Sequence, residues 1–321
     1  MPTPENFAVD ISYLKLSLLA TGIVISGCSG ANGDLTYDGA TSSSSHTDQS
    51  FDADEFWTQE RQKAAVEPQL NEQAKLTLPD DAFEDSKSAA YERANAAAPP
   101  VEVDTIEWPY NTVGKVFSVR ADGSMTVCTG QVMAPTKTVV MTAAHCLVDA
   151  KLIWGKKRTF ILGAGGPNPQ VFETDCAIRF TDFRYGQSWR TVAADIAFLR
   201  LKRPAPKALG VTTPPERVLE SLGYPAGYKG GAVPVKVQGM RGPISRKRRV
   251  VALATHPKMD RGASGGAWLF GPNIVGMNSQ NNGRGYMLGP LITQNVIDLH
   301  KYLRDPSTCV TRFNHPIRSG A

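Results

Sequence analysis

The sequence of 321 residues lacks the signatures of several large classes of protein. Its first apolar stretch, residues 16–25, is too short to cross a bilayer as a helix. No cluster of Cys, His, Asp and Glu has the spacing of a metal site, and no glycine-rich loop has the phosphate-binding pattern. The densest basic run, residues 245–249, comes without a nucleic-acid motif and is most simply a solvated loop, with an anionic-surface contact or a processing site as alternatives. We therefore expect no metal, no other cofactor and no nucleic-acid partner.

Cysteine is also scarce, and the first of the five cysteines ends a stretch with the features of an export signal. Lys15 precedes the apolar stretch, which closes on Ile25-Ser26-Gly27-Cys28. That ending resembles a bacterial lipobox, in which the signal is cut before the cysteine and the thiol is lipidated. We predict a signal peptide over 1–27 and an exported protein held at the membrane of the bacterial cell envelope by lipid on Cys28. Because acidic residues precede Lys15, the alternatives are a start downstream of Met1 or an ordinary signal peptide on a secreted protein.

Charge is distributed unevenly on the two sides of Pro99-Pro100. Residues 29–100 carry 14 acidic and 5 basic side chains, whereas residues 101–321 carry 14 acidic and 29 basic ones. The acidic part is rich in Ser, Ala, Asp and Glu, so it should bury too little apolar surface to offset its ordering entropy. We predict a largely disordered tether or pro-region over 28–100, with helix-permissive stretches near 55–65 and 82–97. A further hypothesis is that its negative charge docks it against the basic remainder of the chain.

From residue 106 onward, short β-rich runs alternate with Gly and Pro, which is typical of an antiparallel barrel or sandwich. We predict strands at 116–120, 138–143, 159–162, 194–201, 233–238, 249–254, 267–270 and 273–279. A break near 202–206 would separate two barrels, over about 106–203 and 207–303. A helix is expected at 292–303, with His300 exposed. Its buried side would comprise Ile292, Val296, Leu299, Tyr302 and Leu303.

Three short motifs place a histidine, an aspartate and a serine in one order along this part of the chain. They are Thr142-Ala143-Ala144-His145-Cys146, Asp195-Ile196-Ala197-Phe198-Leu199 and Gly262-Ala263-Ser264-Gly265-Gly266. A serine hydroxyl is a weak nucleophile until an imidazole accepts its proton, and a carboxylate must hold that imidazole in the right tautomer. Gly-x-Ser-x-Gly also fits the nucleophile elbow of α/β-hydrolases. That fold places the acid and the histidine after the serine, however, and here only 57 residues follow Ser264.

The Thr-Ala-Ala-His-Cys run and the order of the motifs resemble the trypsin-like (chymotrypsin-fold) serine peptidases, in particular the compact bacterial branch near the glutamyl endopeptidases. The resemblance extends from about residue 113 to about residue 303. It implies an all-β fold of two antiparallel six-stranded barrels with a C-terminal helix, within a protease domain over 101–321. It also implies a serine endopeptidase, expected as a monomer, that acts on protein or peptide substrates. The alternative is a surface-anchored binding protein that reuses the fold without catalysis.

The same resemblance assigns roles to individual residues. His145 would be the general base, Asp195, at the opening of an apolar strand, would orient it, and Ser264 would attack the scissile carbonyl. The backbone N–H groups of Gly262 and Ser264 would form the oxyanion hole. Ser279 matches the strand that supports the aspartate and pairs with substrate backbone.

Two disulfides are expected in an exported chain of this kind. Cys128 and Cys146 match the family's bridge between the histidine loop and the preceding strand. With Cys28 lipidated, Cys176 and Cys309 remain as the second pair.

The sequence departs from trypsin at the positions that govern activation and specificity. Ala263 precedes the serine where trypsin has an aspartate, so we expect no switch in which a new N-terminus pairs with that position. Lys258, Met259 and Asp260 would form the floor of the specificity pocket, and residues 278–281, with Asn278, Ser279 and Asn281, its wall. No aspartate stands at the trypsin-like floor position to favour Arg or Lys, and Asn278 replaces the histidine usual in glutamyl endopeptidases. The preferred residue before the scissile bond is therefore not predicted.

Overall fold

The structure is a computed structural model that describes most of the chain from residue 97 to residue 297 and two earlier segments. The described residues are 35–39, 51–68, 97–180, 182–186, 188–213, 215, 218–246, 249–282, 285–294, 296–297, 300 and 303. The predicted signal peptide, Cys28 and Cys309 lie outside them, as does most of the 82–97 stretch. Among the helices of the described residues, none has the length and apolar character needed to cross a membrane.

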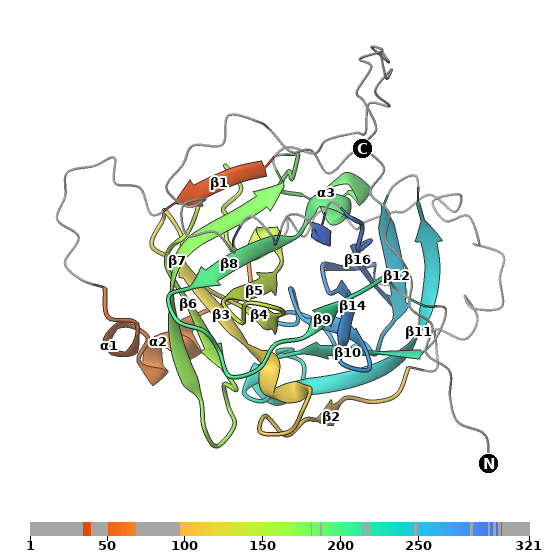
Figure 1. The fold of residues 1–321 in the computed structure, drawn as a ribbon, viewed down its shortest axis with the longest axis horizontal. Helices are drawn as coiled ribbons and strands as arrows, with labels where there is room; N and C mark the ends of the chain where they lie inside the picture. Colours follow the sequence, from red (N-terminus) through yellow and green to blue (C-terminus); the bar gives the residue numbers. More distant parts are fainter. Residues whose placement is uncertain are drawn as a thin grey trace, which may run out of the picture. The chain divides into compact units, whose positions relative to one another are not determined.

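Six strands of the first half close into an antiparallel barrel (Figure 1, yellow to green). They are β3 (Val113–Val119), β4 (Met125–Met133), β5 (Val139–Thr142), β6 (Lys156–Leu162), β7 (Gln170–Phe180) and β8 (Ala197–Leu201). Their order is β7-β6-β3-β4-β5-β8, and β8 pairs back with β7 to complete the ring. Every residue of β5 is buried, as expected for a short apolar strand inside a closed barrel.

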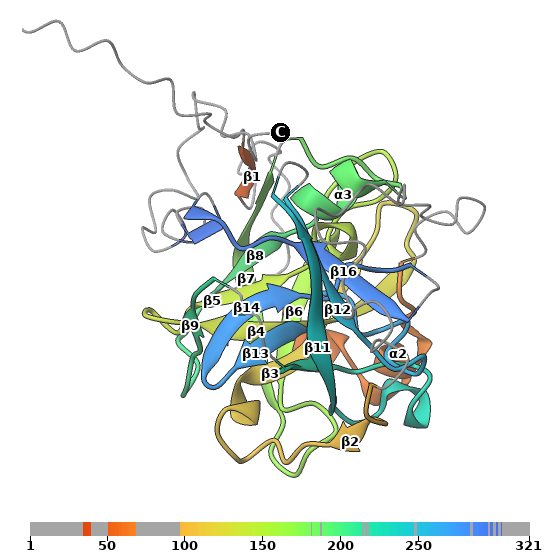
Figure 2. The same ribbon diagram turned by 90° about the vertical axis from the view of Figure 1, so that its right-hand side faces the viewer.

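The second half forms another antiparallel sheet, cyan to blue in Figure 1 and turned toward the viewer in Figure 2. Its strands are β10 (Val218–Gly223), β11 (Val235–Ser245), β12 (Val250–Ala254), β13 (Ala267–Phe270), β14 (Asn273–Met277), β15 (Gln280–Asn281) and β16 (Tyr286–Pro290). The order is β15-β16-β12-β11-β10-β13-β14. Only Asn278 and Ser279 separate β14 from β15, so the chain itself connects these two strands. Among the described residues no strand pairing closes this sheet as β7–β8 closes the first, and we refer to it below as the second barrel. Two short strands extend it: β9 (Gly210–Val211) lies beside β14, and β2 (Val101–Glu102) beside β11.

This architecture confirms the predicted all-β chymotrypsin-like fold and the break between its halves, because β8 ends at Leu201 and β9 begins at Gly210. The few helices are short: η2 (Tyr110–Thr112), η3 (Ala144–Cys146), α3 (Trp189–Ala194) and η4 (Lys229–Gly231). The strand predicted from residue 194 is wrong at its start, since α3 runs through Ala194 and β8 begins only at Ala197.

The C-terminal helix is described only in part. Residues 294, 296, 297 and 300 are helical, and Ile292, Val296 and Leu303 are buried as predicted, while Leu299 and Tyr302 lie outside the described residues. The prediction that His300 is exposed is wrong. It is 4% exposed, and its Nδ1 forms a hydrogen bond with the carbonyl oxygen of Ile297, which satisfies the buried ring.

Two segments that precede the domain are ordered against the first barrel. β1 (Leu35–Gly39) pairs with β7, while α1 (Ala53–Phe56) contacts β7 and α2 (Gln59–Ala64) contacts β4. The helices confirm the helix-permissive stretch near 55–65 and begin at side-chain caps, Asp52 for α1 and Thr58 for α2. This part of the predicted tether therefore has a defined fold on the barrel.

Candidate active site

His145 and Asp195 lie side by side because their strands are neighbours. β5 ends at Thr142 just before the turn of helix that carries His145, and Thr142 is in register with Ala197, two residues after Asp195. The His145 Nδ1 atom lies 2.7 Å from Asp195 Oδ2, and the His145 backbone N–H donates to Oδ1 at 2.9 Å. Both side chains are fully buried. This geometry turns Nδ1 to the carboxylate and leaves Nε2 as the atom that can accept a proton.

Electrostatics in this pair favour the imidazolium. Burial, the largest influence, lowers the pKa of His145, but the charge and hydrogen bond of Asp195 outweigh it, and the charge of Glu67 acts in the same direction. The net pKa of His145 is raised. Ser279 Oγ donates to Asp195 Oδ2 at 2.5 Å, so three donors fix the carboxylate. The structure thus brings Ser279 against Asp195.

Ser264 lies in the loop between β12 and β13 of the second barrel and is 8% exposed. The glycines around it adopt left-handed backbone conformations, with φ of +88° at Gly262 and +81° at Gly265. A Cβ atom at Gly262 would lie 2.3 Å from the Tyr224 carbonyl oxygen, and one at Gly265 would lie 2.3 Å from the Thr129 carbonyl oxygen. Only glycine satisfies both conditions, which explains its place in the motif.

Residues of β4 in the first barrel form hydrogen bonds with the loop that carries Ser264. The Thr129 backbone N–H donates to the Ser264 carbonyl oxygen at 2.8 Å, and Thr129 Oγ1 donates to the Gly262 carbonyl oxygen at 2.7 Å. The same hydroxyl accepts from the Tyr224 N–H at 3.0 Å. Gln131 Nε2 donates to the Gly265 carbonyl oxygen at 2.9 Å. The serine is therefore positioned relative to the histidine by hydrogen bonds across the two barrels, which sequence reasoning did not identify.

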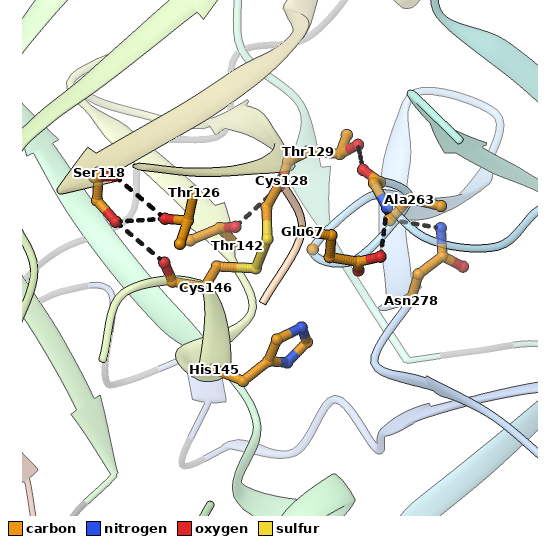
Figure 3. Close-up of a disulfide and its surroundings, with 12 residues drawn as sticks. Glu67, Ser118, Thr126, Cys128, Thr129, Thr142, His145, Cys146, Ala263 and Asn278 are labelled. Atoms are coloured by element: carbon orange, nitrogen blue, oxygen red, sulfur yellow. Dashed lines mark hydrogen bonds between the residues drawn. A yellow bond between two sulfur atoms is a disulfide. The ribbon is translucent and has the colours of Figure 1, made fainter. Parts of the chain in front are cut away.

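A disulfide lies beside the histidine. Cys128 and Cys146 form a disulfide, which confirms the first predicted bridge. The bond joins β4, at the residue before Thr129, to the turn that carries His145 (Figure 3). Cys176 is fully buried on β7 and is also disulfide-bonded. Because Cys309 lies outside the described residues, the Cys176–Cys309 pairing stays a prediction.

Ala263 is held by the backbone around it. Its N–H donates to the Asp260 carbonyl oxygen at 3.0 Å, and its carbonyl oxygen accepts from the Gly266 N–H at 2.9 Å and from Asn278 Nδ2 at 3.1 Å. These bonds fix the turn next to Ser264, and the expected absence of the trypsin-type switch stays a prediction.

Four of the residues predicted to line the specificity pocket lie in unlike surroundings. Lys258 and Asn281 are exposed, Met259 is fully buried in the apolar core of the second barrel, and Asn278 is also fully buried. Besides Ala263, the Asn278 amide bonds to the Leu222 carbonyl oxygen, Ser221 Oγ and Trp268 Nε1. An amide has two donor hydrogens and room for two acceptor bonds, so Asn278 is fully engaged inside the barrel.

Glu67 completes the site and was not predicted. It follows α2, and its Oε2 atom accepts a hydrogen bond from the Gly262 N–H at 2.5 Å (Figure 3). Burial, the largest influence, raises the pKa of Glu67, as does Asp260, while the charge of His145, the Ser264 hydroxyl and the Gly262 N–H oppose the rise.

The only group of potential metal ligands within the described residues is Cys128, His145 and Cys146. Both cysteines are consumed in the disulfide and offer no thiolate. The histidine is bonded to Asp195. Of these three residues, only His145 can transfer a proton, and together they do not offer the ligands that a metal ion needs.

Comparisons with known proteins agree with this geometry. The family model for Trypsin matches residues 101–302. A solved structure of a Glu endopeptidase is 16% identical, with a TM-score of 0.53, and the match covers 63% of this chain and 95% of that one. A thermostable serine protease, AL20, from an extremophilic microorganism is 20% identical, with a TM-score of 0.50 and coverage of 60% and 95%. No curated protein matches the chain. At these identities the solved structures show a shared fold, and the family model, which spans more than half of the sequence, shows that the chain belongs to the trypsin family.

Proposed function

We propose that this protein is a serine endopeptidase that hydrolyses peptide bonds through an acyl-enzyme on Ser264. The observation that carries the proposal is the buried pair His145–Asp195, 2.7 Å apart, on the first barrel, with the motif serine held across the barrel interface by Thr129. An activated serine needs this base and this orienting carboxylate.

In the proposed mechanism, His145 Nε2 accepts the Ser264 proton as the oxygen attacks the scissile carbonyl, and later protonates the leaving amine. Asp195 keeps Nδ1 protonated and stabilises the imidazolium, which agrees with the raised pKa of His145. The Gly262 N–H, which the left-handed glycine backbone turns into the site, would stabilise the oxyanion together with the Ser264 N–H. Water then hydrolyses the acyl-enzyme, with His145 as base again.

The proposed substrates are proteins or peptides, as the family implies. Lys258 and Asn281 are the proposed pocket residues open to solvent, whereas Met259 and Asn278 would shape the pocket from within the core. A monomer that is exported and anchored by lipid on Cys28 is part of the same proposal. Palmitate labelling of the wild type, lost in Cys28→Ser, would test the anchor.

The test of catalysis is digestion of a mixed peptide library by the intact chain, with Ser264→Ala as control and mass spectrometry as readout. Labelling of Ser264 by a fluorophosphonate provides a second, more sensitive measurement. Loss of a triad residue should lower turnover by about 10⁴-fold or more. Cleavage by the wild type alone would support the endopeptidase. If neither cleavage nor labelling occurs in the folded wild type or in a variant with the Glu67 carboxylate removed, the non-catalytic binding protein is the correct function.

A further inference from the structure

The segment 51–68 is packed onto the first barrel through one buried aromatic side chain. Trp57 is 2% exposed, its ring centroid lies 5.0 Å from that of Phe117, and its Nε1 donates to the Lys157 carbonyl oxygen at 3.1 Å. The Lys157 ammonium group lies 3.8 Å from the centroid of the Phe56 ring. A buried indole whose N–H is hydrogen-bonded contributes a large apolar contact without leaving a polar group unpaired, so Trp57 holds the segment firmly on the barrel. This segment is therefore docked at a defined place.

From that anchor the chain runs alongside the catalytic groups. Val66 forms a parallel β-bridge with Thr126 on β4, in which its N–H donates to the Met125 carbonyl oxygen at 3.0 Å and its carbonyl oxygen accepts from the Val127 N–H at 3.2 Å. The next residue on β4 is Cys128, which is bonded to the neighbour of His145. The Val66 side chain is 63% exposed, so the backbone and not the side chain holds this position.

Because Val66 is fixed to β4, the next residue, Glu67, lies at the site where the substrate carbonyl would bind. Its carboxylate accepts from the Gly262 N–H, the group that would bind the oxyanion next to Ser264. His145 Nε2, which should face the Ser264 hydroxyl, is buried and has no hydrogen-bond partner among the described residues. The proposed base is thus without its hydrogen bond to the serine, and the N–H of the proposed oxyanion hole is taken by the Glu67 carboxylate, which lies close to His145 in Figure 3.

We infer that residues 51–68 are an intramolecular inhibitor of the active site, with the Glu67 carboxylate as the blocking group. The inference rests on the proposed function. The carboxylate occupies the place of the substrate's carbonyl oxygen at the Gly262 N–H. The docked segment excludes substrate from this side of the cleft, so catalysis requires that the segment leave.

A purely structural role for Glu67 fits these contacts poorly. A buried carboxylate is disfavoured by desolvation, and burial is the largest influence on its pKa. The fold already anchors the segment through Trp57 and Val66. The carboxylate adds contacts only to groups of the proposed reaction.

The test compares second-order rate constants for fluorophosphonate labelling of Ser264 in the full chain and in Glu67→Ala, with intact mass checked to exclude self-cleavage. Glu60→Ala is the matched control, because Glu60 is an exposed acid on the same segment. Glu67→Ala should react at least tenfold faster than the wild type, a change of about 1.4 kcal/mol, and Glu60→Ala should stay within about twofold. Equal labelling of wild type and Glu67→Ala would overturn the inference and leave the proposed function intact. Absence of labelling in every folded variant would overturn both.

A second variant tests release of the segment without changing Glu67 or any proposed catalytic residue. Val66→Pro removes the N–H that donates to Met125, and Ala65 already has the extended backbone that a following proline requires, with φ of −70° and ψ of 132°. We expect Val66→Pro to label faster than wild type, and Val66→Thr, which keeps the N–H, to label at the wild-type rate. Circular dichroism confirms that each variant is folded. If Val66→Pro labels no faster than Val66→Thr, docking of the segment is not what limits the serine.

Discussion

The hydroxyl of Thr129 offers a sharp test of how the two barrels position the nucleophile. It donates to the Gly262 carbonyl oxygen at 2.7 Å and accepts from the Tyr224 N–H at 3.0 Å, at a fully buried site. Thr129→Val keeps the shape and the backbone bond to Ser264 but removes both side-chain bonds. A buried polar group left without a partner costs about 1–3 kcal/mol. With two such groups, we expect a loss of about 2–6 kcal/mol in the free energy of unfolding.

Most of that range lies below the roughly 5–15 kcal/mol that stabilises a typical domain, so the variant should still fold. The measurement is urea unfolding followed by tryptophan fluorescence, in a Ser264→Ala background that prevents self-digestion. Thr129→Ser is the matched control, since it keeps the hydroxyl and loses only a methyl group. The reasoning would be refuted if Thr129→Val and Thr129→Ser unfolded within about 0.5 kcal/mol of each other, the scatter expected of substitutions without a specific effect.

Two further predictions follow from the buried groups. The Glu67 carboxyl has a raised pKa in the docked state because of burial, so docking takes up protons at this group. Docking should weaken as pH rises from 4.5 through the raised pKa of Glu67, and the labelling rate of the wild type should climb more steeply with pH than that of Glu67→Ala; parallel profiles would contradict this. Asn278→Ala leaves Trp268 Nε1 and Ser221 Oγ without their acceptor inside the barrel and should lower the free energy of unfolding by about 2–5 kcal/mol. Chemical denaturation should detect this loss, against a change below about 0.5 kcal/mol for the exposed Asn168→Ala.

The sequence predicted those parts of the site that depend on short motifs of neighbouring residues. The turn with His145, the loop with Ser264 and the bridge at Cys128 each depend on local backbone geometry, for which the glycines and the cysteine are direct signals. The alternation of short apolar runs and turns likewise indicated strands and the break between barrels. Errors occurred at element ends, such as the start of β8, where a helix and a strand share an apolar run, and the strands β4, β7, β10 and β16 were not predicted.

The contacts that sequence reasoning missed join residues far apart in the chain. The hydrogen bond from Gly262 to Glu67 spans 195 positions, and that from Thr129 to Gly262 spans 133. The composition of residues 29–100 as a whole led to a wrong expectation of disorder for one part of it. The acidic average conceals a short stretch that contains the aromatic residues Phe51, Phe56 and Trp57. Those three neighbouring aromatic residues were the available signal of a docking segment.

The inhibitory segment lies on the first barrel, whereas the chain enters the domain through β2 on the second. Residues 69–96, 28 in number, link the two. While that link is intact, the segment meets its own site at an effective concentration on the order of 1 mM. Once it is severed, the segment becomes an ordinary ligand at its bulk concentration. With a dissociation constant of about 10 µM, roughly 99% of the uncut molecules would be closed, while a cut sample at about 0.1 µM would be almost entirely open. Dilution after cleavage, and not cleavage alone, would then set the fraction of working enzyme.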